Sequence, residues 1–190
     1  MSSSTPSSAD LDTLIGLFYP QADALGRFES RRDDELSDDY RKLLAHSRHM
    51  TVTVEQRHGS SVDVEVMDVR RTDTHYSRKI LLRRQSDQRV VQFGIVRLAL
   101  SAVAEPARSE ILSEQIPLGR VLIKHNVLRS VQLLGLWQVA CGPDLASLFS
   151  VDVGHVTYGR TALIYCDGEP AVELLEIVAP EDCFPPTDPS

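Results

Sequence analysis

The sequence predicts an α+β fold in which an antiparallel sheet carries helices on one face. Apolar and polar residues alternate with period two over residues 62–67, as in a half-buried strand. Further strands are predicted over residues 75–84, 88–102 and 127–140. No long helical segment separates these strands, so parallel crossovers are not expected, and neighbouring strands should run antiparallel.

The last strand pair, residues 157–180, is the most informative part of the chain. Two apolar-rich runs flank Asp167-Gly168, a dipeptide that readily takes the positive φ angles of a tight hairpin turn. The second run places Glu176 among Leu174, Leu175, Ile177 and Val178. A carboxylate among apolar residues either points to water or is held in a pocket where it has a function.

Short helices are predicted between and before the strands. The helical segments are residues 11–19, 38–46, 50–58, 107–112 and 118–124. The second begins at Asp38 or Asp39, and the third ends at the break His58-Gly59. The charged stretch 28–39 is predicted to be a linking loop.

Length and composition fit one globular domain over residues 11–180. The chain has 190 residues, of which 42% are hydrophobic, enough for a single core. Residues 1–10, rich in serine, are predicted to form a disordered lead-in without the features of a secretory signal. Residues 181–190 are predicted to form a loose tail, and no apolar run is long enough for a membrane helix.

Charge and cysteine usage limit the partners and the compartment. The net charge of −7 disfavours nonspecific attraction to nucleic acid or to an anionic membrane. Three widely spaced cysteines argue against a disulfide scaffold and favour a reducing cytoplasm. No heptad pattern demands association, so a monomer is favoured.

Common catalytic and metal-binding motifs are not found in the sequence. His46 and His49 lie three residues apart, but no motif supplies further metal ligands, and surface or helix-end histidines are the better interpretation. The sequence holds no nucleophile elbow and no glycine-rich phosphate loop.

A few residues stand out as candidates for a binding site. Alternation places Arg78 on the apolar side of its strand, where a guanidinium needs an anionic partner from the protein or from a ligand. Residues 117–119 can present backbone N–H groups to a carboxylate at a helix start. Met50 would ordinarily be core, and Arg160 begins the final hairpin.

Taken in order, these segments resemble the chorismate pyruvate-lyase family. The resemblance rests on residues 43–44, 50–51, 76–82, 116–120, 158–160, 167–170 and 174–180. It covers roughly residues 40–180. It implies an antiparallel six-stranded sheet with helices on one face, an enclosed site, and conversion of chorismate to 4-hydroxybenzoate and pyruvate without metal or organic cofactor.

The resemblance also implies roles for individual residues. Arg78 matches the arginine that binds a carboxylate of substrate or product, and Glu176 matches the acid that faces the ring hydroxyl. Met50 and Leu118 match positions whose backbone amides help to hold the carboxylate. Gly119 and Arg160 are further candidates for substrate binding.

The sequence departs from the family pattern in two places. One extra residue lies between Pro170 and Glu176, so that Glu173 competes for the role of the acid unless a β-bulge restores the register. Where some relatives carry a Gly-Arg pair, this chain reads Gln92-Phe-Gly94, which leaves Arg97 and Arg160 as candidates for a second anion contact.

Two rival functions remain open. The same fold resembles the effector-sensing domains of bacterial transcription regulators, so a non-catalytic sensor of an aromatic or cyclic carboxylate is the main alternative. A free-standing sensor would be required, because the segment before Tyr40 is too short and too acidic for a DNA-reading domain. A purely structural or partner-binding protein is the third option, and the presence of both Arg78 and Glu176 argues against it.

Overall fold

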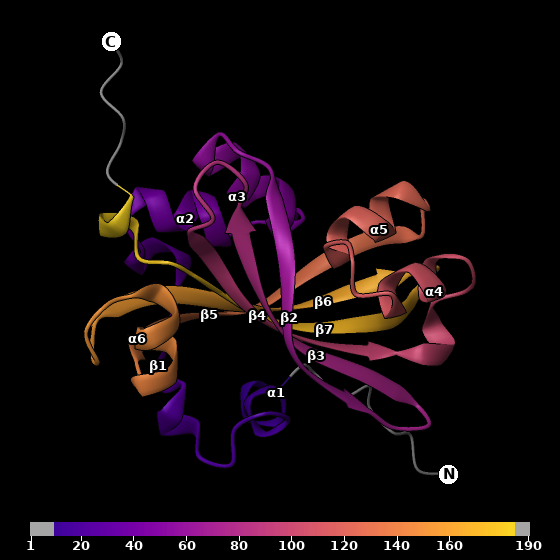
Figure 1. The fold of residues 1–190 in the computed structure, drawn as a ribbon, viewed down its shortest axis with the longest axis horizontal. Coiled ribbons are helices and arrows are strands. Elements are labelled where there is room, and N and C mark those ends of the chain that lie inside the picture. The colour runs from indigo at the N-terminus through magenta and orange to yellow at the C-terminus, as the bar shows by residue number, and fades with distance from the viewer. Residues whose placement is uncertain (1–9, 185–190) are drawn as a thin grey trace.

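A single antiparallel sheet organises the fold (Figure 1). The computed structural model describes residues 10–184, apart from the side chains of residues 128 and 129, and the range 10–184 denotes this described part. The strands are β1 (Gly26–Arg31), β2 (Val62–Arg71), β3 (His75–Arg84), β4 (Val90–Ala99), β5 (Leu128–Cys141), β6 (Val156–Cys166) and β7 (Glu169–Val178). They lie in the order β1-β5-β6-β7-β4-β3-β2, and all neighbouring pairs are antiparallel. The predicted α+β class with an antiparallel sheet is confirmed.

Six short α-helices within residues 10–184 pack around the sheet. They are α1 (Leu11–Gly16), α2 (Asp38–Leu44), α3 (Met50–His58), α4 (Ala107–Leu112), α5 (Leu118–Lys124) and α6 (Pro143–Phe149). Figure 1 shows α2, α3, α4 and α5 along one side of the sheet and α1 on the other. No helix in the described part of the chain is long and apolar enough to cross a membrane.

The strand register determines which side chains share a face. One row across four strands consists of Ile80, Gly94, Glu176 and Arg160, and the next row consists of Arg78, Val96, Leu174 and Ala162. Directly opposite residues face the same side, as do residues two apart on one strand. Arg78 and Glu176 therefore lie on one face of the sheet. We call it the chamber face, because a chamber lies between this face and the starts of α3 and α5.

The opposite face of the sheet is covered by α1. Leu14 and Ile15 of α1 are buried, and α1 contacts β4 and β7. Just beyond the helix, the ring of Tyr19 lies 6.5 Å from that of Phe93, which alternates with Gly94 and so points away from the chamber face. The sequence predicted helices on one face, and α1 adds a short cover on the second.

The seventh strand corrects the expected count of six. Residues 26–31 pair with β5 from Gly26 opposite Cys141 to Arg31 opposite Leu136. Part of this segment was predicted to be a charged linking loop. An edge strand leaves one side unpaired and exposes many side chains, so charged residues are tolerated there and no alternating pattern is required.

Helix α6 was not predicted from the sequence, where residues 141–144 indicated only a break after the long strand. The break is itself a helix start, because Pro143 occupies the first helical position after Gly142. The helix ends at Ser150, which adopts a left-handed conformation with φ 57°.

The predicted terminal segments are only partly described. The predicted lead-in, residues 1–10, lies outside the described residues except for Asp10, whose side chain caps α1. Of the predicted tail, residues 185–190 lie outside the described range. Residues 181–183 form a 3₁₀ turn, Glu181 pairs with Arg57, and Phe184 is buried.

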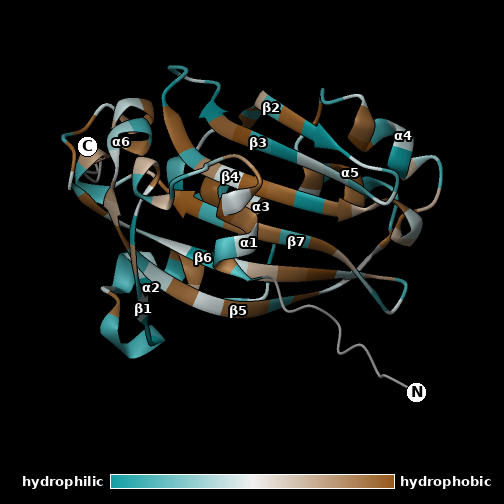
Figure 2. Cartoon of the chain, turned by 90° about the horizontal axis from the view of Figure 1, so that it is seen from below, coloured by the Kyte–Doolittle hydropathy of each residue, from teal (hydrophilic) through white to brown (hydrophobic). Residues whose placement is uncertain are grey.

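Two clusters of apolar side chains form the core. One includes Met50, Ile80 and Leu82, and the other includes Val96 and Leu118. Figure 2 shows apolar and polar residues alternating along the edge strand β2, which therefore buries one face only. The chamber lies on the chamber face of the sheet, where the two clusters meet.

Gly142 provides a direct test of this packing. A Cβ at Gly142 would lie 2.2 Å from the carbonyl oxygen of Asp23 and 2.6 Å from that of Ala24. We expect Gly142→Ala to lower the free energy of unfolding by about 2–4 kcal/mol, because backbone atoms must move to admit the methyl group. Urea unfolding measures this, with Gly16→Ala as the control because nothing lies within 4 Å of that Cβ. Equal effects of the two substitutions would contradict the close packing at Gly142.

Candidate functional site

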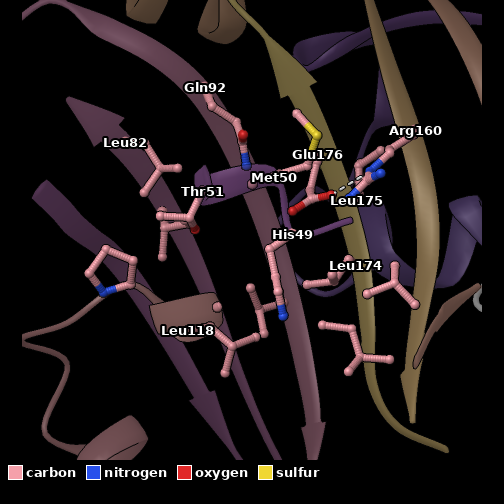
Figure 3. A pocket seen from close by; sticks show the side chains of 17 residues that line it. His49, Met50, Thr51, Leu82, Gln92, Leu118, Arg160, Leu174, Leu175 and Glu176 are labelled. Carbon is pink, nitrogen blue, oxygen red and sulfur yellow. Dashed lines mark hydrogen bonds and ion pairs between the residues drawn. The ribbon is translucent and has the colours of Figure 1, made fainter. Parts of the chain in front are cut away.

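A mainly apolar chamber lies between the starts of α3 and α5 and the chamber face of the sheet (Figure 3). About 500 Å³ in and around the chamber is free of atoms, a volume that includes open solvent. Its floor includes Gly94, over which the side chain of Ile80 packs: a Cβ at Gly94 would lie 3.2 Å from Cγ1 of Ile80. The polar side chains of the lining are His49, Thr51, Gln92, Arg160 and Glu176.

Most of the residues predicted from sequence converge on this chamber. The lining includes Met50, Leu118, Gly119, Arg160 and Glu176. Arg78 does not itself line the chamber. It lies one row further along the chamber face, opposite Val96, which is part of the lining.

Gly119 allows the two helix starts to approach each other. A Cβ at this position would lie 3.1 Å from Nδ1 of His49 and 3.2 Å from Oγ1 of Thr51. A side chain there would push α5 away from α3 or force these two residues to move. The role of Gly119 in the geometry is therefore close packing at the wall of the chamber.

Glu176 and Arg160 form a buried ion pair. Nε of Arg160 donates to Oε2 of Glu176 at 2.7 Å, and the two residues are 1% and 8% exposed, respectively. Figure 3 shows the other carboxylate oxygen of Glu176 directed into the chamber. Glu176 thus presents one hydrogen-bond acceptor to a ligand while the other oxygen is held by the protein.

The remaining donors of Arg160 hold the loop between α2 and α3. Its Nη1 donates to the carbonyl of His46 at 2.9 Å and more weakly to that of Leu44 at 3.4 Å, and its Nη2 donates to the carbonyl of Arg48 at 3.1 Å. Arg160 therefore joins Glu176 to the loop that leads into Met50. Because its donors are engaged within the protein, its contribution is to shape the chamber.

His46 is part of the same network. Its Nε2 lies 2.7 Å from the carbonyl of Leu43, and the backbone N–H of Arg48 donates to its Nδ1. Burial and the charge of Arg160 lower the pKa of His46 to about 4, so the ring is neutral at physiological pH. No group of three potential metal ligands occurs within residues 10–184.

The register separates Glu176 from its competitor Glu173. Glu173 lies on the opposite face, where it pairs with Arg97 at 2.9 Å. Ala171 is an extra residue on β7, since Ile164 lies opposite Val172 while Tyr165 lies opposite Pro170. This bulge absorbs the extra residue noted in the sequence and directs Glu176 to the chamber face.

Arg78 is fully buried, and its guanidinium makes no hydrogen bond of good geometry to the described residues, although the Tyr76 hydroxyl lies close to it. It is 0% exposed, and none of its three side-chain nitrogens has a hydrogen-bond partner among residues 10–184. Burial lowers the pKa of Arg78, whereas the charge of the Tyr76 oxygen, a side-chain interaction with its hydroxyl and the charge of Glu114 raise it. The Tyr76 hydroxyl is itself bonded to Glu114, so it does not satisfy the guanidinium. Glu114 is already engaged, since it accepts from Tyr76 at 2.9 Å and pairs with Arg71 at 3.3 Å.

Sequence reasoning missed two polar residues of the chamber, His49 and Gln92. Nε2 of His49 and Oε1 of Gln92 are buried without hydrogen-bond partners among the described residues. His49 was interpreted as a surface or helix-end residue, and it does precede α3, but its ring projects into the chamber (Figure 3). Gln92 could have been found from its spacing, because it lies two residues before Gly94 on the same strand face.

Comparisons with known proteins show the fold. No protein-family model and no curated protein matches the sequence. PhnF from Mycobacterium smegmatis is similar in structure, with a TM-score of 0.53 and 11% identity over 69% of this chain and 63% of PhnF. Gene product SA0254 from Staphylococcus aureus has a TM-score of 0.50 and 10% identity, over 62% of this chain and 82% of its own.

A third similar structure is the ligand-binding domain of a Bordetella bronchiseptica protein assigned to the GntR family of transcriptional regulators. Its TM-score is 0.48 and its identity 14%, over 62% of this chain and 85% of that domain. At these identities the similarities establish the fold class alone, and the chemistry has to be argued from the chamber.

The hydrogen bonds that Arg160 makes to Glu176 and to the loop between α2 and α3 lead to a prediction about stability. We expect Arg160→Met to lower the free energy of unfolding by about 3–5 kcal/mol, because it leaves Glu176 buried without its partner. Hydrogen exchange should also become faster in residues 44–49, which lose the contacts of the guanidinium. Urea unfolding and exchange mass spectrometry measure the two effects.

Arg97→Met is the matched control for this prediction. The Arg97–Glu173 pair has a similar geometry but is more exposed, so its loss should cost about 1 kcal/mol or less. Equal losses in both variants, or unchanged exchange in the loop of the Arg160 variant, would show that Arg160 does not hold this loop.

Proposed function

We propose that this domain binds a small cyclic or aromatic carboxylate in the chamber, with Arg78 as the receptor for the carboxylate. The observation that carries the proposal is the buried guanidinium of Arg78, whose nitrogens have no hydrogen-bond partner within residues 10–184. A buried charge without a partner is strongly unfavourable, and an anionic ligand relieves that cost.

A carboxylate fits Arg78 better than the protein groups nearby. The planar guanidinium presents paired N–H groups that match the two oxygens of a carboxylate. The acid in the chamber, Glu176, is paired with Arg160, and Glu114 is engaged by Tyr76 and Arg71. An external carboxylate is therefore the group that the arrangement accepts.

The rest of the lining fits a ring. The chamber is mainly apolar, and side chains such as Ile80, Leu82 and Leu174 offer apolar surface to a ring. Glu176 and Gln92 supply polar contacts in a neighbouring part of the lining. A ring that carries a carboxylate at one end and a hydroxyl at the other meets all of these groups.

The fixed environment of Glu176 favours binding without chemical change, as in a sensor. One of its oxygens is held by Arg160, which is in turn tied to the loop before α3. An acid held in this way is organised to accept a hydrogen bond from a ligand hydroxyl. The fold also resembles the effector-sensing domains of bacterial regulators, which supports the same function.

The second candidate function is elimination of pyruvate from chorismate. It is favoured because Glu176 directs one oxygen into the chamber on the same face as Arg78, and because the sequence motifs resemble the lyase family. In this reaction the bond between the ring carbon and the ether oxygen breaks, and enolpyruvate leaves. The ring also loses the proton from the carbon that bears the hydroxyl, and so becomes aromatic. Glu176 would accept that proton, and the departing enolpyruvate becomes pyruvate on taking up a proton.

Removal of the Arg78 charge tests the proposed binding. We expect Arg78→Met to weaken binding of 4-hydroxybenzoate at least about 100-fold, because two charge-assisted hydrogen bonds are lost. The ligand-free variant should be as stable as the wild type or more stable, because a partnerless buried cation is replaced by an apolar side chain. Titration calorimetry and urea unfolding provide the measurements.

Arg97→Met again provides the control, since Arg97 lies on the opposite face and should not affect binding. Unchanged affinity of the Arg78 variant for 4-hydroxybenzoate would remove Arg78 as the carboxylate receptor. A large loss of stability in that variant would show that Arg78 has a structural partner.

Incubation with chorismate separates the two functions. Binding without chemical change predicts that chorismate is recovered intact by chromatography. The lyase function predicts equal amounts of 4-hydroxybenzoate and pyruvate, with turnover lost in Glu176→Gln and kept in Glu173→Gln. Product formation by wild-type protein that is equally impaired by both substitutions would contradict the role of Glu176 under either function.

A further inference from the structure

His49 presents an unpaired nitrogen to the chamber. It is the residue immediately before α3, on the loop whose carbonyls at His46 and Arg48 are held by Arg160. Its Nδ1 lies on the side facing the start of α5, 3.1 Å from the position of a Cβ at Gly119. Its Nε2 is buried and has no hydrogen-bond partner within the described residues.

The environment of His49 favours the neutral form of the ring. Burial, with the charge of Arg160 as the smaller cause, lowers the pKa of His49. A neutral imidazole carries one N–H donor, and a buried ring nitrogen without a partner is unfavourable. A ligand group placed beside Nε2 would supply the missing hydrogen bond.

The position of the ring indicates which end of the ligand it meets. Figure 3 shows the His49 side chain directed away from Glu176, toward Leu118 and Leu174. Leu174 belongs to the same row of the sheet as Arg78, whereas Glu176 belongs to the neighbouring row. His49 therefore faces the part of the chamber nearer to Arg78.

We propose that His49 is a specificity-determining residue that donates a hydrogen bond from Nε2 to the same ligand carboxylate that Arg78 binds. This inference rests on the proposed function. The row of the sheet that His49 faces carries the buried cation of Arg78, which favours an anionic group at this position over a neutral one. With Nε2 as the donor, Nδ1 is the acceptor, and it lies on the same side as the hydroxyl of Thr51.

Two donors on one carboxylate would fix the orientation of the ligand. Arg78 approaches from the sheet and His49 from the start of α3, so the carboxylate lies between them and the ring extends toward Gly94 and Glu176. A hydroxyl at the far end of the ring then meets Glu176. His49 would consequently affect the affinity for the carboxylate and leave recognition of the hydroxyl unchanged.

The test compares benzoate with 4-hydroxybenzoate in titration calorimetry of wild-type protein and His49→Phe, which keeps a ring but removes both nitrogens. We expect the affinity for both acids to fall about 10-fold or more, because both carry the carboxylate. The ratio of the two affinities should stay unchanged. His49→Gln, which restores an N–H donor, should recover part of the loss. Thermal unfolding of both variants checks that the fold is kept.

Other outcomes would overturn the inference. If His49→Phe weakens only 4-hydroxybenzoate, His49 contacts the hydroxyl instead of the carboxylate. If both affinities are unchanged, His49 makes no contact with the ligand. The control His155→Phe, on a partly exposed histidine paired with Asp182, should change neither affinity. Failure of the wild-type protein to bind either acid would instead refute the proposed function, independently of any variant.

Discussion

A guanidinium that is fully buried without a hydrogen-bond partner raises the free energy of the folded protein, and this constraint links the fold to the function. The register of β3, β4, β7 and β6 places Arg78 on the same face as Glu176, one row apart. Burial beneath the helices of that face shields the charge from water. Under the proposed function, this cation is held in position for the carboxylate of a ligand.

The two buried arginines have different tasks. The side-chain nitrogens of Arg160 donate hydrogen bonds to Glu176 and to carbonyls of the loop before α3, so Arg160 fixes the shape of the chamber. Arg78 has no such partners among the described residues and, although it lies one row beyond the chamber lining, is the group that we propose binds the ligand carboxylate. The sequence pattern treated both as anion-binding candidates, because an arginine in an apolar strand looks the same whether or not its donors are engaged.

Much of the fold and of the site could be predicted from local patterns. The helices at residues 107–112 and 118–124 and the strand at 75–84 were predicted with the observed bounds, because their apolar spacing and their breaks are clear. Strand β1 was not predicted, because an exposed edge strand does not require alternating apolar and polar residues. A bulge before Glu176 was one of two possibilities left open by the sequence, and pairing with the neighbouring strand decided between them. The position of His49 depends on loop packing, which local sequence does not encode.

The most direct measurement of the central claim is a crystal structure of the protein with 4-hydroxybenzoate bound. The account predicts that the ligand lies in the chamber with its carboxylate within about 3 Å of the nitrogens of Arg78 and its hydroxyl near Glu176. A carboxylate bound away from Arg78, or a ligand bound outside the chamber while Arg78 stays without a partner, would contradict it.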